Sequence, residues 1–202
     1  MLLTNSSTIL QKNNIVEGRR LHFYDKAELI PLAQEGIWQV YRGVVQLSQF
    51  SSSGDEILLG WVYPENFFGL WLTANQLENY QARALSDVYL RWYPLVEIES
   101  SPTLSQLILG QVLHRMRQSE ALLAIAGLRR VDERLQELLK LLAQDMGQST
   151  PEGTRLKVRL THQMLANAIG TTRVTITRLL GDFQAQGQIR FDDDRHLIIC
   201  FA

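Results

Sequence analysis

The sequence has a single cysteine among its 202 residues, which excludes an internal disulfide and a redox switch built from paired cysteines. It also has no run of about 18 apolar residues, the length that a membrane-spanning helix needs. The first residues, MLLTNSSTILQKNN, are too polar for a secretory signal peptide. We therefore expect a cytoplasmic protein that does not enter a membrane. Cys200 lies in the apolar segment HLIICFA, which favours a buried structural thiol.

The closely spaced histidines and carboxylates that hold metal ions are missing as well. The histidines are scattered, at positions 22, 114, 162 and 196. A cupin-type enzyme, which a β-rich half might suggest, would therefore have no metal ligands. The acids Asp192 to Asp194 follow each other directly and are expected to form a solvated hairpin tip. We predict no catalytic residues, no metal and no resident cofactor.

Charge is nearly balanced over the whole chain, with a formal net charge of −1, but it is unevenly distributed. Residues 1–128 carry 9 basic and 12 acidic side chains, whereas residues 129–202 carry 11 basic and 9 acidic ones. From Arg155 to Arg178 there are five basic residues and no acidic one. A local basic surface of this kind is what binding to nucleic-acid phosphates requires.

The segment from about Glu17 to Pro94 consists of short β-type runs separated by turn residues. GIWQVYRGVVQLSQF and ILLGWVY are two such runs, and SSSGDE between them is typical of a hairpin turn. DVYLRWYPL is a further run. We expect residues 1–100 to form an antiparallel β-roll of the jelly-roll type, within an overall α+β fold.

A long helix is predicted within residues 101–128, because Pro102 is favoured in a first helical turn. Small and apolar side chains recur along this helix at spacings of three and four and form a continuous seam. The seam consists of Leu109, Val112, Met116, Ser119, Leu123 and Ala126. Such a seam can pack on the same helix of a second subunit, which predicts a homodimer. A helix buried in the core of a monomer is the alternative.

Residues 129–202 begin with a second amphipathic helix that ends at Gly147, followed by a predicted loop, QSTPEGT, and a short basic strand, RLKVRL. The chain ends with QIRFDDDRHLIIC, which is typical of two strands around an acidic turn. Between them, residues 162–181 fit the helix-turn-helix pattern in one register. Gly170 occupies the tight turn and Ala166 the point where the helices cross. The core positions are filled by Leu165, Ile169, Ile176 and Leu179.

This register predicts a winged helix-turn-helix domain that binds DNA, rather than a purely structural helical hairpin. It leaves four side chains on the outer side of the second helix, and we predict that they read bases: Arg173, Val174, Thr177 and Arg178. Arginine can donate two hydrogen bonds to guanine, and valine can contact a thymine methyl group. Polar residues around them are expected to contact DNA phosphates: Thr161, His162, Gln163, Thr172, Thr175 and Arg195.

A β-rich half, a long connecting helix and a terminal helix-turn-helix together resemble the CRP/FNR family of transcription regulators over nearly the whole chain. LTHQMLANAIGTTRVTITRLLGD is especially similar to the recognition region of cyanobacterial nitrogen regulators of the NtcA type. The resemblance implies a homodimer on a two-fold symmetric DNA site with a GTA…TAC-like core, and RNA polymerase as a partner. The catabolite-activator branch reads DNA with an Arg-Glu-x-x-x-x-Arg motif. Arg173 and Arg178 match it, but Val174 replaces the glutamate.

The resemblance also places a candidate effector pocket around PENFFGLWLTANQLENYQARAL. Leu70 replaces the glutamate of the cyclic-nucleotide-binding members and no Arg-Ser pair follows, so we predict a signal other than cAMP. The candidate effector pocket consists of Phe68, Gly69, Leu70, Arg83, Arg115 and Glu120. Among these, Phe68-Gly69, Arg115 and Glu120 match residues that hold 2-oxoglutarate in NtcA-type proteins. Glu78 stands where the loop arginine of that group aligns, which disfavours a dianion unless Arg83 substitutes. Another small molecule, a haem held by one histidine, or a protein partner docked on the sensor half are the alternatives.

Overall fold

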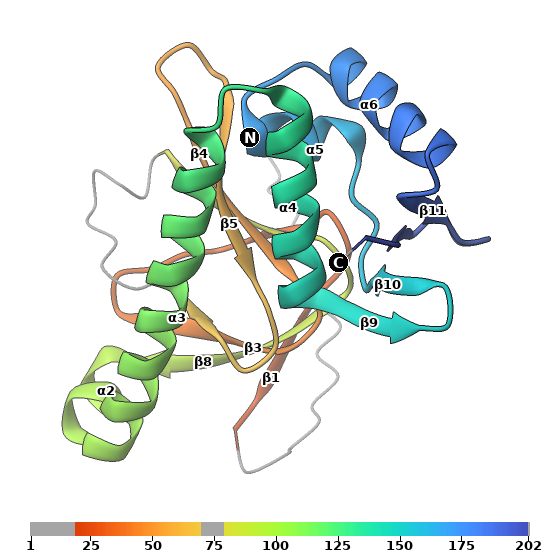
Figure 1. Cartoon of the computed structure of the whole chain (residues 1–202). Helices are drawn as coiled ribbons and strands as arrows, with labels where there is room; N and C mark the ends of the chain where they lie inside the picture. The colour runs from red at the N-terminus through yellow and green to blue at the C-terminus, as the bar shows by residue number, and fades with distance from the viewer. Residues whose placement is uncertain (1–18, 70–78, 202) are drawn as a thin grey trace, which may run out of the picture.

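The computed structural model describes residues 19–69 and 79–201, and Figure 1 shows their arrangement. Two residues of the candidate effector pocket, Leu70 and Glu78, lie outside this part of the chain. The described N-terminal half contains β-strands, a long helix crosses from it to the C-terminal half, and the chain ends in a smaller helical and β-sheet region. Within the described ranges, no helix is long and apolar enough to cross a membrane.

Two antiparallel four-stranded sheets form the N-terminal half. One has the order β1 (Leu21–Tyr24), β8 (Val88–Pro94), β3 (Gly36–Arg42) and β6 (Phe67–Phe68). The other has the order β2 (Leu29–Ile30), β7 (Tyr80–Ala84), β4 (Val45–Phe50) and β5 (Glu56–Val62). Apolar side chains of both sheets pack in one buried cluster, among them Val40 and Leu90 of the first and Leu47 of the second. The predicted β-roll is confirmed.

Three helices follow: α2 (Leu95–Ser100), α3 (Pro102–Ala126) and α4 (Val131–Met146). The hydroxyl of Ser101 accepts a hydrogen bond from the Leu104 amide, which caps the start of α3. α3 and α4 run side by side, with α4 between α3 and the C-terminal region (Figure 1). The predicted start of the long helix at Pro102 and the end of the second helix before Gly147 are confirmed.

The C-terminal region combines a helix pair with a third antiparallel sheet. The helices are α5 (His162–Ile169) and α6 (Arg173–Ala185). The sheet has the order β11 (Ile189–Phe191), β12 (Leu197–Ile199), β10 (Gly153–Leu156) and β9 (Gly147–Thr150). The predicted pair of strands around an acidic turn is confirmed as β11 and β12.

Three local predictions are wrong. The predicted loop QSTPEGT begins within strand β9, because its polar residues form an antiparallel pair with β10. The predicted basic strand is shorter than expected, since β10 ends at Leu156. Cys200 lies just after β12 and is only partly buried, with its thiol 3.9 Å from the carbonyl oxygen of Ile198.

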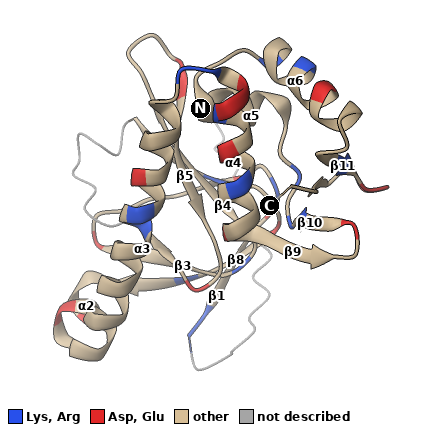
Figure 2. Ribbon diagram, in the orientation of Figure 1, with Lys and Arg blue, Asp and Glu red and all other residues tan. Residues whose placement is uncertain are grey.

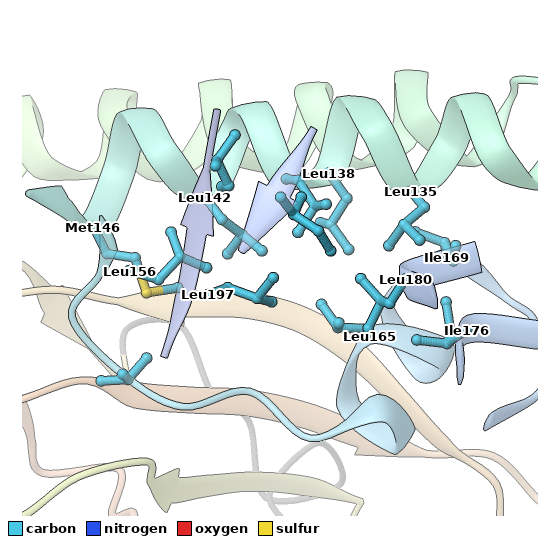
Figure 3. Close-up of a cluster of buried hydrophobic side chains, with 14 of the residues drawn as sticks. Leu135, Leu138, Leu142, Met146, Leu156, Leu165, Ile169, Ile176, Leu180 and Leu197 are labelled. Carbon is cyan, nitrogen blue, oxygen red and sulfur yellow. The ribbon is translucent and has the colours of Figure 1, made fainter. Parts of the chain in front are cut away.

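The largest buried cluster joins the two halves of the chain. Figure 3 shows the leucines of α4, Leu135, Leu138 and Leu142, above the side chains of α5 and α6. Side chains from the β-roll belong to the same cluster: Val44, Trp61, Tyr63 and Leu85. The N-terminal half therefore supports the helices of the C-terminal half through apolar contact, in addition to the covalent link through α3.

Candidate nucleic-acid interface

The turn between α5 and α6 has the backbone that the sequence pattern predicts. Gly170 adopts φ 62° and ψ 54°, a left-handed conformation that favours glycine. The Thr161 hydroxyl accepts a hydrogen bond from the Met164 amide at the start of α5, and Thr172 accepts one from the Thr175 amide at the start of α6. Both helices therefore begin at a side-chain cap, which fixes where each one starts.

The inner face of the helix pair is buried, as the register requires. Leu165, Ala166, Ile169 and Ile176 are each at most 1% exposed, and Leu179 is 6% exposed. In Figure 3, Ile169 of α5 lies between Leu135 of α4 and Ile176 of α6, and Leu165 lies beside Ile176. Because these positions are packed on all sides, α6 can present only its opposite face to a ligand.

Arg134 of α4 supports the turn, although no pattern in the sequence marks this residue. Its Nη1 atom donates a hydrogen bond of 2.7 Å to the carbonyl oxygen of Ile169, the last residue of α5. Carbonyl groups in the last turn of a helix lack an amide partner within the helix, and a cation there also suits the helix dipole. An arginine 35 residues away on an amphipathic helix looks in the sequence like any solvated charge.

The four predicted base-reading side chains are all exposed on α6: Arg173, Val174, Thr177 and Arg178. Val174 is 78% exposed, so its side chain is accessible to a ligand. Nη1 of Arg178 lies 3.2 Å from Oδ2 of Asp182, one turn further along. Figure 2 shows these basic and acidic segments following each other along α6. An exposed ion pair of this kind contributes little to stability, so separating Arg178 from Asp182 costs little free energy.

The predicted phosphate-contacting residues lie at the starts of α5 and α6 and, for Arg195, between β11 and β12. Thr161, Gln163, Thr172 and Arg195 are exposed, while His162 and Thr175 are partly buried. The structure adds internal roles for several of them. Thr161 and Thr172 are the helix caps described above, and Gln163 donates a hydrogen bond of 2.7 Å to Asn167. Their hydroxyl and amide groups lie at the N-terminal ends of two helices, where anions are favoured.

The hairpin of β11 and β12 is held by an internal ion pair. Nε of Arg155 donates to Oδ2 of Asp192 at 2.6 Å, and Nη2 of Arg155 lies 2.7 Å from Nδ1 of His196. Burial tends to raise the pKa of Asp192, but the hydrogen bond from Arg155 and the backbone amide of His196 outweigh it and lower the pKa to about 2. Arg155 therefore neutralises an acid inside the hairpin and adds less to the basic surface than the sequence suggests.

The acidic turn itself brings potential metal ligands together. Ligand atoms of Asp192, Asp194 and His196 lie within 4.8 Å of one another. However, Arg155 places a positive charge on the same Asp192 carboxylate and beside the same His196 nitrogen. A cation bound there would be repelled by the guanidinium group. The geometry supports the predicted hairpin tip, in which Asp192 accepts hydrogen bonds from Arg155 and from the His196 amide.

Comparisons with known proteins agree with this arrangement. Residues 133–200 match the family described as the Crp-like helix-turn-helix domain. Over 162 residues the chain is 35% identical to the Global nitrogen regulator of Synechocystis sp., covering 77% of this chain and 72% of that protein. The chain belongs to the CRP/FNR family of transcription regulators. The regulatory protein CysR of Synechococcus elongatus is also similar, at 33% identity over 174 residues, or 85% of this chain and 79% of CysR.

Solved structures show the fold of this CRP/FNR regulator in more distant proteins. A CRP-family transcriptional regulator from Thermus thermophilus superposes with a TM-score of 0.74 at 19% identity, over 89% of this chain and 91% of that one. FixK2 from Bradyrhizobium japonicum gives the same TM-score and identity, over 90% and 92% of the two chains. At this identity the likeness concerns the fold alone.

The predicted effector residues of this CRP/FNR regulator differ in burial and in their contacts. Phe68 is buried in the β-roll, and Gly69 has a positive φ of 91°. Arg83 is partly buried, and its guanidinium donates to the carbonyl oxygen of Ala27 at 3.2 Å. Glu120 is exposed on α3. The described residues therefore include both buried and solvent-facing members of the predicted set.

Arg115 connects three elements of the CRP/FNR regulator. Its Nη1 atom donates a 2.9 Å hydrogen bond to the Trp61 carbonyl in β5 and also bonds Gln118 in α3. Gln118 in turn donates to Oδ2 of Asp145 in α4 at 2.9 Å. Burial lowers the pKa of Arg115, and nearby Tyr80 opposes that shift. A polar chain thus runs from the β-roll through the long helix to the C-terminal half.

The predicted dimer seam is a mostly exposed stripe on α3. Leu109, Met116, Ser119, Leu123 and Ala126 are exposed, and Val112 is partly buried. The opposite side of α3 is buried at Ile108, Gln118 and Ile125. α3 is therefore not enclosed in the core of this chain, since Leu123 is 74% exposed, whereas the homodimer stays a prediction.

Proposed function

We propose that this regulator binds double-stranded DNA as a homodimer on a two-fold symmetric site, with α6 of each subunit in the major groove. The observation that carries the proposal is the joint exposure of Arg173, Val174, Thr177 and Arg178 on a helix whose other face is buried. The two arginines would hydrogen-bond guanines, and Val174 would contact a thymine methyl group. Thr161, His162, Gln163, Thr172, Thr175 and Arg195 would fix the register through phosphates.

The exposed stripe on α3 supports the homodimer. Soluble monomers rarely leave several large apolar side chains uncovered along one helix face. Packing Leu109, Met116 and Leu123 against the same residues of a second subunit would remove them from water and relate the two subunits by a two-fold axis. We divide the chain accordingly into a sensor domain (1–100), a dimerisation helix (101–128) and a DNA-binding domain (129–202).

The sensor half would respond to a signal other than cAMP and act without enzymatic chemistry. The polar chain from Trp61 through Arg115 and Gln118 to Asp145 offers a route for that response. An effector that bound Arg115 better in one arrangement of this chain would shift the population of C-terminal arrangements. RNA polymerase would be the partner that reads the outcome in the cytoplasm. A protein docked on the sensor half is the alternative source of the signal.

Selection from a random DNA library tests the central claim. The full-length protein should enrich a two-fold symmetric site, and its affinity should fall steeply with salt because phosphate contacts release counterions. Enrichment of no symmetric sequence contradicts the proposal. A panel of metabolites that includes 2-oxoglutarate and cAMP is then tested for any effect on affinity for the selected site. A metabolite that changes this affinity indicates small-molecule control. Native mass spectrometry of the protein from cell extract detects the alternative, a bound protein partner.

A further inference from the structure

His162 and Thr177 are joined by a hydrogen bond across the helix pair. Nδ1 of His162, the first residue of α5, lies 2.7 Å from Oγ1 of Thr177 on the outer face of α6. The same oxygen of Thr177 lies 2.9 Å from the carbonyl oxygen of Arg173, one turn earlier. One hydroxyl group therefore has two protein partners before any DNA is present.

Counting protons fixes the direction of both bonds. A threonine hydroxyl has one proton to donate, and a backbone carbonyl can only accept. The Thr177 proton must therefore go to the Arg173 carbonyl. The bond to His162 then needs its proton from the ring, so Nδ1 of His162 carries hydrogen and donates to Thr177.

In this arrangement the γ-methyl group of Thr177 has no role in the two hydrogen bonds. The donor capacity of the hydroxyl is used by Arg173, and one of its lone pairs accepts from His162. Threonine is also stiff at χ1, so holding its oxygen in place holds its methyl group in place as well. The side chain is exposed, and the methyl group is what remains available for an apolar contact.

We propose that Thr177 reads DNA through its γ-methyl group, against the 5-methyl group of a thymine, and that His162 is the positioning residue that keeps its hydroxyl turned away. Apolar contact with the thymine methyl is one of the few ways in which a side chain without a free donor distinguishes bases in the major groove. This inference rests on the proposed function, because it assumes that α6 enters that groove.

The test begins with the site enriched by the full-length protein. Each thymine of one half-site is replaced in turn by deoxyuridine, which removes the 5-methyl group and nothing else. Binding is measured for the wild type, Thr177→Val, which keeps the γ-methyl group, and Thr177→Ser, which keeps only the hydroxyl. At one thymine we expect the wild type and Thr177→Val to lose affinity by about three- to fourfold, the effect of one buried methyl-sized group, and Thr177→Ser to lose none.

Val174 serves as an internal control, because its contact should make a different thymine sensitive. That second penalty should disappear in Val174→Ala and persist in both Thr177 variants. For His162, replacement by alanine should reduce the Thr177-dependent penalty, and replacement by asparagine, which can offer an N–H at the same place, should restore it.

The outcomes separate cleanly. If Thr177→Ser keeps every deoxyuridine penalty of the wild type, or Thr177→Val loses the one assigned to it, Thr177 does not read a methyl group. If His162→Ala leaves the penalty unchanged, His162 has no positioning role. Either result leaves the DNA-binding proposal intact, whereas failure to enrich any symmetric site removes the proposed function itself.

Discussion

Nη1 of Arg134 lies 2.7 Å from the carbonyl oxygen of Ile169, so a side chain of α4 holds the end of α5 next to the Gly170 turn. The bond joins α4, which packs beside α3, to the helix pair that carries the candidate DNA-binding surface. The two residues are far apart in the sequence, so no local sequence pattern predicts their contact. Because of this bond, the position of the turn depends on α4.

Replacing Arg134 with leucine should lower the free energy of unfolding by about 1 to 2 kcal/mol, since hydrogen bonds to charged groups contribute about 1.5 to 3 kcal/mol and the partial exposure of this site reduces that value. Urea unfolding followed by circular dichroism measures the change. The matched control is Arg129→Leu at an exposed position, expected to change stability by less than about 0.5 kcal/mol. Equal losses in both variants would show that the bond to Ile169 adds nothing.

Arg173→Ala and Arg178→Ala should each relax base preference at one position of the half-site. A good bidentate contact is worth about 1 to 3 kcal/mol of discrimination against the wrong base. Competition binding with single-base variants of the selected site measures this preference. Loss of affinity without loss of preference would assign the arginine to a phosphate instead.

Asp182→Asn should increase DNA affinity by a few-fold, since a carboxylate one turn after Arg178 competes with DNA for that guanidinium and repels phosphates. The exposed pair is worth little in the free protein, so stability should hardly change. Fluorescence anisotropy at two salt concentrations shows the gain, which should shrink at high salt. Glu99→Gln on α2 is the control for a distant exposed acid and should have no effect.

The ion pair of the hairpin predicts a pH dependence. Asp192 has a pKa of about 2 in the folded protein against an ordinary value of 3.8, so the unfolded chain takes up its proton first as the pH falls. The stabilisation by Asp192 is therefore present above about pH 4 and is lost as the pH falls towards 2. In unfolding experiments across this range, wild type and Asp192→Asn should converge at low pH. Asp193→Asn, at the exposed neighbouring position, should follow the wild type throughout.

Leu123→Glu should weaken self-association by more than about tenfold, because it would place an unpaired charge in an apolar interface. Val96→Glu is a closely matched control, since Val96 on α2 is 76% exposed, Leu123 is 74% exposed, and Val96 lies off the seam. Sedimentation equilibrium distinguishes the two. A Leu123→Glu protein as dimeric as the Val96→Glu protein would place the subunit contact elsewhere.

The helix-turn-helix could be predicted from the sequence because its constraints are local. Gly170 needs a left-handed backbone, and Leu165, Ile169 and Ile176 need to be buried at fixed spacings from it, all within a few turns of helix. The long helix was equally clear, since Pro102 and the apolar seam lie in one continuous segment.

What could not be predicted depends on partners that are distant in the sequence. The polar strand β9 exists only because β10 pairs with it, and its own residues have no β-type pattern. In the sequence Arg155 belongs to the basic segment, but in the fold its guanidinium pairs with Asp192, 37 residues later. Arg115 matched a ligand position of related regulators, but its contact with the Trp61 carbonyl could not be anticipated without the fold.

The shared apolar cluster limits how freely the two halves can be exchanged between regulators. Val44, Trp61, Tyr63 and Leu85 fill space beside the helices of the C-terminal half. A hybrid that kept this C-terminal half but took its sensor from another regulator would have to supply side chains of the same volume at these places, or leave a void. The β-roll and the helix pair therefore constrain each other's side-chain volumes, as two parts of one packed unit.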